Sequence, residues 1–244
     1  MVIHSLENEK VKNLIKLQRK KYRDLTGTYL VEGRHIVEEA YRAGVLLEVY
    51  LLEGEEYSYD VDSYSVSLDV MKKISMMDTP SSIVGVCKKI ENTEIVGDRI
   101  LLLDEIQDPG NLGTIIRSAV AFDVDMILLS DDSVDLYNPK VLRATQGILF
   151  HIPIVRMDSM SVIDKLKNKG YILYGTNVVN GVEVSSLTLE DKRRWCLIMG
   201  NEGKGLKREI QDLCDKNLYI PMNSNVESLN VGVACSILLY EFRR

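Results

Sequence analysis

The chain has 244 residues, of which 45% are hydrophobic and 27% charged, and its formal net charge is −6. These proportions are typical of a soluble globular protein, and the length suits one large or two modest domains. The N-terminus has no apolar stretch of signal-peptide length, and no apolar run in the sequence is long enough to span a membrane. We therefore expect a cytoplasmic protein, and the acidic balance argues against promiscuous nucleic-acid binding.

The cysteines and histidines show no metal-binding pattern. The four cysteines form no Cys-x-x-Cys pair and lie in apolar surroundings, and the three histidines are scattered without ligand spacing. Free, buried thiols in a reducing compartment are the simplest interpretation. We expect no bound metal.

Basic residues concentrate near the N-terminus despite the acidic total. Between residues 10 and 23 the apolar positions Val11, Leu14, Ile15 and Leu17 alternate with Lys10, Lys12, Lys16, Arg19, Lys20, Lys21 and Arg23. This pattern predicts one amphipathic helix over about residues 7–22 with a basic outer face. A charge run is most often only a solvated face, but such a face also suits the phosphates of a nucleic acid.

The N-terminal third of the chain is expected to form a small α/β domain. Its pattern predicts, in order, that first helix, a strand (28–32), a helix (34–43), a strand (46–52), a polar loop, a helix (67–76) and a strand (83–90). A polar break follows at residues 91–94 and 97–98. We place the domain boundary there, with domains over residues 1–94 and 97–244.

The remainder of the chain alternates strongly apolar strands with helices. The pattern predicts strands at 100–103, 126–130, 152–155, 171–175, 195–199 and 217–220, with helices at 112–122, 138–147, 159–168, 206–214 and 228–243. Short, wholly apolar strands are covered on both faces in parallel sheets. The alternation therefore predicts an α/β domain with a parallel sheet and helices on both sides.

Three polar loops follow predicted strands and are the candidate functional motifs. They are Asp104–Ala119, Leu197–Leu206 and Ile220–Ala234. In open parallel sheets, ligands bind beyond the carboxyl ends of the strands, where all three loops fall. In the third loop, Ser228 is expected to cap the last helix, leaving the Asn230 side chain in the first turn free for a ligand.

The glycines of the second loop exclude two common nucleotide motifs. The spacing Gly-x-x-Gly-x-Gly, from Gly200 to Gly205, is the reverse of the dinucleotide fingerprint and comes late in the chain. Leu206 and Lys207 stand where a P-loop would require Lys and Ser or Thr. A nucleotide-dependent dehydrogenase or kinase is therefore disfavoured. A simple tight turn remains an alternative for this loop taken alone.

The three motifs together resemble the SpoU (TrmH-like) class of RNA 2′-O-ribose methyltransferases, within the knotted SPOUT superfamily. The resemblance rests on Asn-x-Gly-x-Ile-x-Arg, Gly-Asn-Glu-Gly-x-Gly-Leu and Ile-Pro-Met…Ser-Leu-Asn-Val, and it covers roughly Arg99 to the C-terminus. It implies a C-terminal trefoil knot around the cofactor site. The earlier segment, through Lys20–Arg23 and Val31–Gly33, looks like the substrate-binding, ribosomal-protein-L30e-like α/β domain often fused ahead of these enzymes.

The resemblance implies S-adenosyl-L-methionine as cofactor and assigns candidate residues to three groups. The expected catalytic residues are Asn111, Arg117, Glu202, Ser228 and Asn230. The expected cofactor-binding residues are Thr176, Gly200, Asn201, Glu202, Gly203, Ile220, Met222, Ser228, Leu229 and Asn230. The expected RNA-binding residues are Lys16, Arg19, Lys20, Arg23, Lys140 and Arg143. Thr145 and Gln146 stand where small Ser or Ala residues are common in the family, so the chain departs from the family pattern in this segment.

The chemistry of the side chains limits what each can do. A guanidinium is effectively always protonated, so we expect Arg117 to bind a phosphate and stabilise the forming alkoxide rather than act as a base. Glu202 is then the nearest plausible proton acceptor. Methyl transfer requires neither a metal nor a covalent enzyme intermediate, so positioning is expected to carry most of the catalysis.

The sequence thus predicts an S-adenosylmethionine-dependent RNA 2′-O-ribose methyltransferase, with ribosomal RNA preferred over transfer RNA as substrate. A non-catalytic RNA-binding or ribosome-assembly factor is the alternative, disfavoured because all five expected catalytic residues are present. The last helix is apolar over much of its circumference. Burial within the monomer is one explanation, but the resemblance favours a homodimer through the C-terminal domain.

Overall fold

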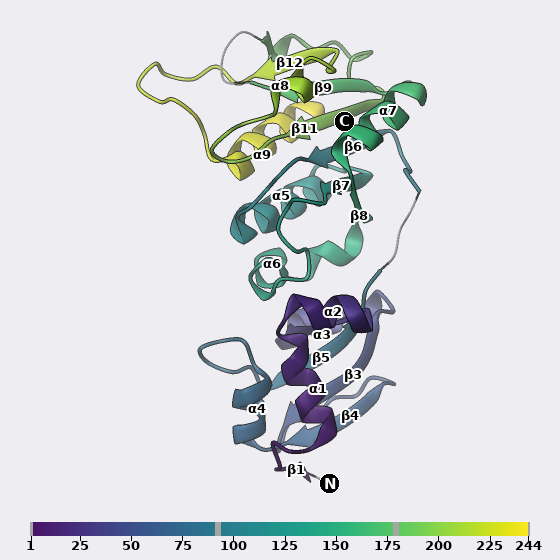
Figure 1. Ribbon diagram of the computed structural model, residues 1–244, viewed down its shortest axis with the longest axis vertical. Coiled ribbons are helices and arrows are strands. Elements are labelled where there is room, and N and C mark those ends of the chain that lie inside the picture. Colours follow the sequence, from purple (N-terminus) through teal and green to yellow (C-terminus); the bar gives the residue numbers. More distant parts are fainter. Residues whose placement is uncertain (1, 91–93, 178–180, 244) are drawn as a thin grey trace. The chain divides into compact units, whose positions relative to one another are not determined.

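The computed structural model describes residues 2–90, 94–177 and 181–243, so most of the polar break expected at 91–94 lies outside the described residues. The chain forms two compact units, Met1–Glu91 with Asp135–Phe150, and Asn92–Val134 with His151–Arg244 (Figure 1). Residues 135–150 therefore group with the first unit, whereas the sequence-based division places them in the second domain. The reason lies in packing, because helix α6 (Pro139–Thr145) contacts strand β2 (Thr28–Glu32).

The first unit is built on a five-stranded mixed sheet. The strand order is β1-β4-β3-β5-β2, in which β5 runs antiparallel to β3 and β2 while β4 is parallel to β1 and β3. Its other elements are β1 (Val2–Ile3), α1 (Glu9–Leu17), α2 (Lys20–Thr26), α3 (Arg34–Arg42), β3 (Leu46–Leu52), β4 (Asp62–Val66), α4 (Leu68–Ile74) and β5 (Ile83–Lys88), and the 3-10 helix η1 (Ile148–His151) follows α6.

The single N-terminal helix expected over residues 7–22 is wrong, because the structure has two. Helix α1 ends at Leu17, and Arg19 is extended before α2 begins at Lys20. The Arg23 guanidinium stabilises this break by donating hydrogen bonds to the carbonyl oxygens of Leu17 and Gln18, both at 2.9 Å. Those carbonyls would otherwise continue the helical ladder.

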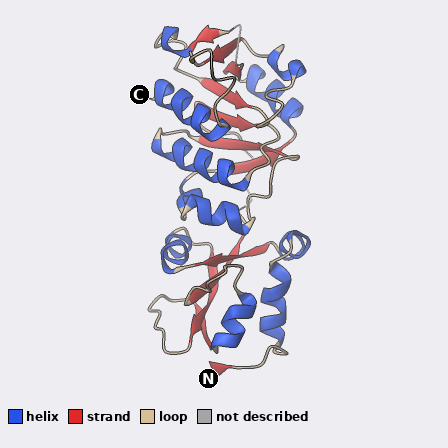
Figure 2. Ribbon diagram, turned by 90° about the vertical axis from the view of Figure 1, so that its left-hand side faces the viewer, coloured by secondary structure: helices blue, strands red, loops and turns tan. Residues whose placement is uncertain are grey.

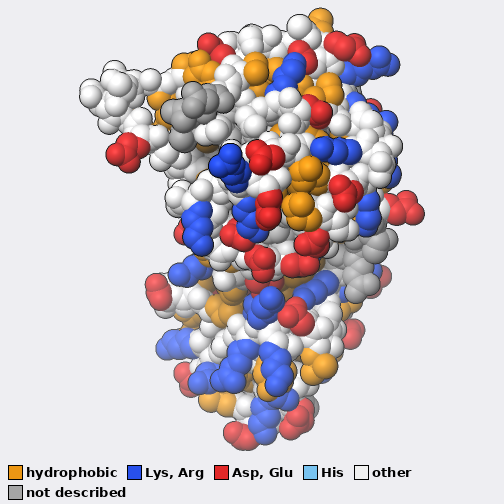
Figure 3. All heavy atoms as spheres, turned by 45° about the horizontal axis from the view of Figure 1, so that its top comes forward, with side chains coloured by type: hydrophobic (Ala, Val, Ile, Leu, Met, Phe, Trp, Pro, Cys, Tyr) orange, Lys and Arg blue, Asp and Glu red, His pale blue; other side chains and the backbone are white. Residues whose placement is uncertain are grey.

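Arg23 also departs from its expected place on the exposed basic face. It is only 5% exposed, and its Nη2 lies 2.6 Å from the Asp135 carboxylate. Arg23 therefore forms a structural ion pair with Asp135, and its guanidinium is not available to RNA phosphates. Lys16, Arg19 and Lys20 remain exposed, as expected. Figure 3 shows Lys and Arg side chains gathered on the first unit.

The loop expected between residues 52 and 67 contains strand β4. Its side chains are mostly polar, Tyr64 and Val66 are its two apolar positions, and only Val66 is fully buried. Pairing with β3 on one side and with the short β1 on the other makes this segment a strand. The prediction failed because strand formation here depends on neighbours, not on local pattern.

The second unit confirms the predicted parallel α/β fold. Its sheet has the order β10-β12-β9-β11-β6-β7-β8, and every pairing among the described strands is parallel. The elements are β6 (Arg99–Leu103), α5 (Pro109–Ala121), β7 (Met126–Ser130), β8 (Ile154–Met157), α7 (Ser159–Asn168), β9 (Ile172–Thr176), β10 (Val182–Glu183), the 3-10 helix η2 (Val184–Ser186), β11 (Trp195–Met199), α8 (Arg208–Gln211), β12 (Lys216–Tyr219) and α9 (Val231–Phe242). The implied trefoil knot stays a prediction.

Helices cover both faces of this sheet (Figure 2). Ile100 and Leu102 of β6 share a buried cluster with residues of α7 and α8. Leu101 and Leu103 are equally buried and point to the opposite face, since side chains alternate along a strand. The wholly apolar strands predicted from the sequence are therefore explained by two-sided burial.

Helices α5 and α9 pack closely because small residues line their contact. A Cβ added at Gly232 would lie 3.2 Å from the Thr114 side chain. Further along, the hydroxyls of Ser118 and Ser236 are hydrogen-bonded at 2.7 Å. This close approach determines how near the N-terminal ends of the two helices come to one another.

No helix among the described residues is long and apolar enough to cross a membrane.

Candidate active site

The three motif loops meet because their strands are neighbours. Strands β12, β9, β11 and β6 are adjacent and parallel, so their carboxyl ends lie at one edge of the sheet. The loop after β6 leads to Asn111, the loop after β11 carries Gly200–Gly205, and the chain after β12 carries Ile220 and Met222. Thr176 ends the fourth strand, β9. This edge is where open parallel sheets bind ligands.

The glycine loop is folded tightly on itself. Asn201 and Gly205 exchange two backbone hydrogen bonds, of 3.1 and 2.9 Å. The Asn201 side-chain oxygen accepts hydrogen bonds from the amides of Gly203 and Lys204. Gly200 is required by space, because a Cβ there would lie 2.4 Å from the backbone nitrogen of Leu206. A Cβ at Gly203 would meet only the Asn201 side chain, at 3.8 Å.

A cavity of about 430 Å³ lies between this loop, the chain after β12 and the start of α9. Nine of the ten expected cofactor-binding residues line it, namely Thr176, Gly200, Asn201, Glu202, Gly203, Ile220, Met222, Ser228 and Leu229. The exception is Asn230. The structure therefore brings together residues that lie more than fifty positions apart in the sequence.

The cavity has the character of a small-molecule site. Its volume falls within the roughly 300–1,000 Å³ typical of ligand pockets. Apolar side chains such as Ile220, Met222 and Leu229 supply surfaces for an adenine ring, and the glycine loop brings backbone groups close to a ligand. The residues present therefore fit a nucleoside-containing cofactor of the size of S-adenosylmethionine.

Sequence reasoning missed several residues that line the cavity. These are Asn177, Met199, Lys204, Gly205, Leu206, Gln211, Leu218, Glu227, Val231, Ala234 and Leu238. Two signals point to some of them. Leu218 precedes Ile220 by the two-residue period of a strand, and Val231, Ala234 and Leu238 share one face of a helix. The others depend on how the loops fold.

Glu202 links the glycine loop to the loop after β6. Its carboxylate accepts hydrogen bonds from the backbone amides of Gln107, at 3.1 and 3.2 Å, and Asp108, at 2.9 Å. It also accepts one from the Asn111 side chain, at 3.2 Å. Gln107 and Asp108 were not expected from the sequence, because only their backbone amides bind Glu202 and a backbone amide does not depend on residue type.

Asn111 and Asn230 extend this hydrogen-bonded chain to the last helix. The Asn230 side-chain amide donates to the Asn111 side-chain oxygen at 2.8 Å. The Asn230 side-chain oxygen accepts from the amides of Gly232 and Val233. Asn230, not Ser228, is therefore the N-cap of α9, and its side chain is not free in the first turn as expected. Asn caps helices as well as Ser does, so residue type alone did not separate the two candidates.

The hydrogen bonds to Glu202 change its acidity. Partial burial raises the pKa of this carboxyl, but the hydrogen bonds from Asp108, Asn111 and Gln107 outweigh it and lower the pKa below its usual value of 4.5. A carboxylate with a lowered pKa and occupied oxygens is a poor proton acceptor. The structure therefore favours a positioning role for Glu202 over the proton-accepting role expected from sequence.

Arg117 lies apart from the cavity lining. It is exposed on α5, and its side chain makes no hydrogen bond or ion pair with any residue that the structure describes. Asn111 is in the first turn of the same helix, so Arg117 follows it by nearly two turns. A free guanidinium on this helix is well suited to binding a phosphate from outside.

A second link joins the same two loops. Lys207 Nζ lies 2.7 Å from the Glu105 carboxylate, and the Asn201 side-chain amide donates to the Glu105 carbonyl at 2.9 Å. The ion pair lowers the pKa of Glu105 and raises that of Lys207. Glu105 adopts a left-handed conformation, with φ of 57°, which is uncommon outside glycine. Neither residue was expected from sequence, because a charge pair that spans two loops shows no spacing signal.

Among the described residues, no group of three or more His, Cys, Asp or Glu side chains is placed to hold a metal ion.

Comparison with known proteins places the site in a family. The sequence model of the SpoU rRNA Methylase family matches residues 98–240, and that of the MRM3-like substrate binding domain matches residues 8–85. The chain is 39% identical, over 99% of its length and 98% of the other protein, to the 23S rRNA (guanosine(2553)-2′-O)-methyltransferase RlmP of Bacillus subtilis.

Solved structures of similar proteins cover nearly the whole chain. The crystal structure of AdoMet-bound rRNA methyltransferase from Sinorhizobium meliloti superposes with a TM-score of 0.89 at 29% identity, covering 100% of this chain and 97% of that one. The SpoU methyltransferase AviRb from Streptomyces viridochromogenes, in complex with AdoMet, gives a TM-score of 0.84 at 26% identity, covering 97% of each chain.

The two glycines of the loop should respond differently to an added methyl group. Gly200→Ala forces the loop away from Leu206, and overpacking strain of about 1–3 kcal/mol should weaken S-adenosylmethionine binding by roughly ten- to a hundredfold. Gly203→Ala, with its Cβ at an ordinary contact distance, should leave the free energy of unfolding unchanged. Calorimetric titration and urea denaturation of both variants measure this; equal effects would contradict the steric argument.

Glu202 should affect turnover without setting its pH dependence. Because the pKa of Glu202 is lowered, the carboxylate stays ionised from pH 6 to 9, and its stabilising effect is present above about pH 4.5 and lost as the pH falls through the folded-state pKa. Glu202→Gln should therefore lower kcat but keep the shape of the pH–rate profile over that range. Unfolding measured from pH 7 to pH 3 should show wild type losing its stability advantage over the variant. A changed profile shape would restore Glu202 as the base.

Proposed function

The chain belongs to the SpoU rRNA methylase family, and we propose that it methylates a ribose 2′-hydroxyl of RNA, with ribosomal RNA as the substrate. The observation that carries this proposal is the convergence of three motif loops around one cavity at the carboxyl ends of adjacent parallel strands. The 2′-O-methyltransferase RlmP of Bacillus subtilis, similar along nearly the whole chain, supports ribosomal over transfer RNA.

The cofactor of the reaction is S-adenosylmethionine, which supplies the methyl group when bound. Transfer forms a bond between the 2′-oxygen and the methyl carbon, breaks the bond from that carbon to the sulfonium sulfur, which leaves as a thioether, and releases the hydroxyl proton to water. The protein's contribution is therefore to position the reacting groups. In this chain the glycine loop and the residues Ile220, Met222 and Leu229 hold the cofactor. The hydrogen-bonded chain of Glu202, Asn111 and Asn230 fixes the loops that surround it.

Arg117 is the residue we assign to the substrate side of the reaction. Its guanidinium carries a permanent charge, is exposed and is not engaged by a described residue. In this role it binds a phosphate beside the target nucleotide and stabilises negative charge that develops on the 2′-oxygen.

The exposed basic residues of α1 and α2 have a separate role in this proposal. Lys16, Arg19 and Lys20 belong to the first unit, whereas every residue that lines the cofactor cavity belongs to the second. We assign these three residues to the neutralisation of RNA phosphates, which contributes affinity but no sequence information.

Separate substitutions should divide chemistry from binding. Arg117→Ala should keep affinity for S-adenosylmethionine and lower methyl transfer by at least about a hundredfold, as expected when one stabilising donor is removed. Arg193→Ala, at another exposed arginine of the same unit, should have no such effect. Transfer of labelled methyl to ribosomal RNA, with mass-spectrometric mapping of ribose methylation, measures this. Normal transfer by Arg117→Ala would contradict the assignment.

The complementary set is Lys16→Ala, Arg19→Ala and Lys20→Ala combined. It should weaken RNA binding and flatten its salt dependence by about 0.7–0.9 per lost phosphate contact, while leaving cofactor affinity unchanged. Arg23 is left unchanged in this variant, because loss of its buried ion pair with Asp135 would confound binding with folding. An unchanged salt slope would remove these residues from the RNA contact.

The last helix supports a further part of the proposal, a homodimer through the second unit. Val233, Ile237 and Tyr240 are 47%, 37% and 48% exposed and form a stripe along α9. Phe122 extends the stripe through an edge contact with Tyr240. The other face of α9 is buried, so an exposed apolar stripe is more than the monomer requires.

Charge introduced into this stripe should separate the two chains. Wild type should show twice the 27.7 kDa chain mass by light scattering, and Ile237→Glu should shift it to the mass of one chain, since a buried unpaired charge is strongly unfavourable. Leu25→Glu, at a 77% exposed residue of α2, is the matched control and should stay dimeric. A monomeric wild type at micromolar concentration would contradict the proposal.

A further inference from the structure

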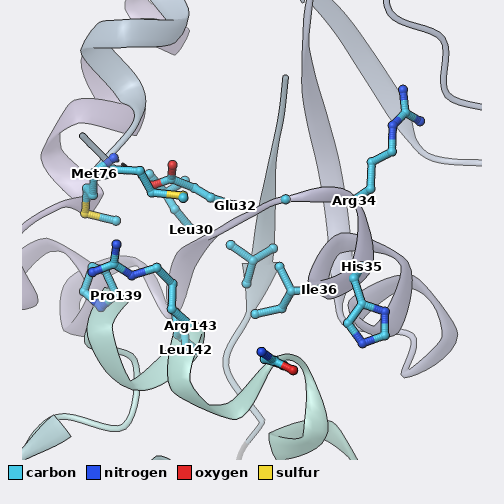
Figure 4. Close-up of a pocket in the computed structure, with 13 residues that line it drawn as sticks. Leu30, Glu32, Arg34, His35, Ile36, Met76, Pro139, Leu142 and Arg143 are labelled. Carbon is cyan, nitrogen blue, oxygen red and sulfur yellow. Dashed lines mark hydrogen bonds between the residues drawn. The ribbon is translucent and has the colours of Figure 1, made fainter. Parts of the chain in front are cut away.

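The first unit contains a cavity that the cofactor site does not explain. It has a volume of about 420 Å³, and all its lining residues belong to that unit. Three segments form it: the end of β2 with the start of α3, the pair Met76–Met77 that follows α4, and helix α6. Figure 4 shows Met76 on one side and Pro139, Leu142 and Arg143 of α6 on the other.

The walls of this cavity are apolar and held in place. Leu30, Ile36 and Leu142 are buried side chains that contribute to its lining. Met76 and Met77 form one wall of the cavity. Glu32 holds this segment in place, because its carboxylate accepts hydrogen bonds from the Ser75 hydroxyl at 2.6 Å and the Met76 amide at 2.7 Å. Glu32 is the only carboxylate among the described lining residues, and these two hydrogen bonds occupy it.

The two arginines that line the cavity differ in whether their guanidinium groups are already hydrogen-bonded. Arg143 is exposed, points toward Met76 in Figure 4, and its side chain has no hydrogen bond or ion pair with a described residue. Arg34, by contrast, points away from the cavity and is engaged by the Glu55 carboxylate and the Glu56 carbonyl. Lys140, one turn before Arg143 on α6, is also exposed. The free positive charge is therefore concentrated on the α6 side.

This combination fits an unpaired nucleotide better than a duplex. An apolar slot between methionine side chains and a guanidinium can hold a base by its faces, because methionine adapts to flat surfaces and arginine stacks on bases. A duplex offers its phosphates outward but keeps its bases stacked inside. A cavity lined by apolar side chains therefore favours a base that has left its stack.

We propose that this cavity binds one unpaired nucleotide of the RNA substrate, with its base between Met76 and the Arg143 guanidinium and its phosphate toward Lys140. The proposal rests on the proposed function, since it deepens how that same RNA is recognised. Unlike the basic residues of α1 and α2, this site would read a base. Gln146 also lines the cavity, and its side-chain amide can donate to and accept from a base edge.

The test uses the full-length protein and a ten-nucleotide single-stranded RNA of random sequence that contains 4-thiouridine. Arg143→Ala, and Met76→Trp to fill the cavity, should each raise the Kd about tenfold, the size expected for loss of one stacked nucleotide. Arg42→Ala, an exposed arginine of α3 in the same unit that does not line the cavity, is the control and should leave the Kd unchanged. Photo-crosslinks should map to Met76–Met77 and to α6.

Gln146→Ala gives a second measurement that does not depend on the filled variant folding. It should change the ranking of the four nucleoside monophosphates as competitors for RNA binding. A Kd unchanged in Arg143→Ala, crosslinks confined to other segments, equal affinity for a ten-base-pair duplex, or competition by inorganic phosphate as strong as by the nucleotides would each overturn the proposal.

Methyl transfer measured in parallel keeps this proposal distinct from the proposed function. If the wild-type protein transfers no methyl group to ribosomal RNA, the function fails whatever the cavity binds. If wild type transfers methyl and Arg143→Ala keeps its KM for RNA, only the nucleotide site fails.

Discussion

The position of the Glu202 carboxylate is the constraint on which the candidate active site depends. Its two oxygens accept hydrogen bonds from two backbone amides of the loop after β6 and from Asn111. Without the Glu202 carboxylate, those backbone amides would lose their hydrogen-bond acceptor. The loops after β6 and β11 would then no longer be held together at this point. The same hydrogen bonds lower the pKa of Glu202, which favours a positioning role for this carboxylate.

The close packing of α5 and α9 makes that network possible. Gly232 and Thr114 allow the two helices to approach, and Ser118 and Ser236 are bonded across the same contact. The N-terminal ends of both helices then lie together, which puts the Asn230 cap within 2.8 Å of Asn111. A helix cap, which usually serves only its own helix, thus becomes part of a chain that reaches the glycine loop.

In the first unit, the Arg23 side chain links segments that are distant in the sequence. Arg23 binds the backbone at the break between α1 and α2. It also forms an ion pair with Asp135, which lies more than a hundred positions further along the chain. That pairing helps bring residues 135–150 into the first unit, and with them Arg143 and the α6 wall of the second cavity. The unit therefore carries two kinds of surface, exposed cations on α1 and α2 and an apolar cavity beside the exposed Arg143 guanidinium.

The sequence by itself determined the alternation of strands and helices, the parallel sheet, the three motif loops and nine of the residues around the cofactor cavity. The strands, helices and loops follow from local signals, namely apolar runs, glycine spacing and the polar residues that end strands, whereas the cofactor-binding residues follow from the resemblance to the SpoU class. It did not determine that Asn230 rather than Ser228 caps α9, that Arg23 is buried, that β4 is a strand, or that Glu202 is held by backbone amides. The cap of α9 is a choice between two residue types that cap helices equally well. The other three features depend on partners distant in sequence, so only the tertiary structure, which brings those partners within hydrogen-bonding distance, decided them.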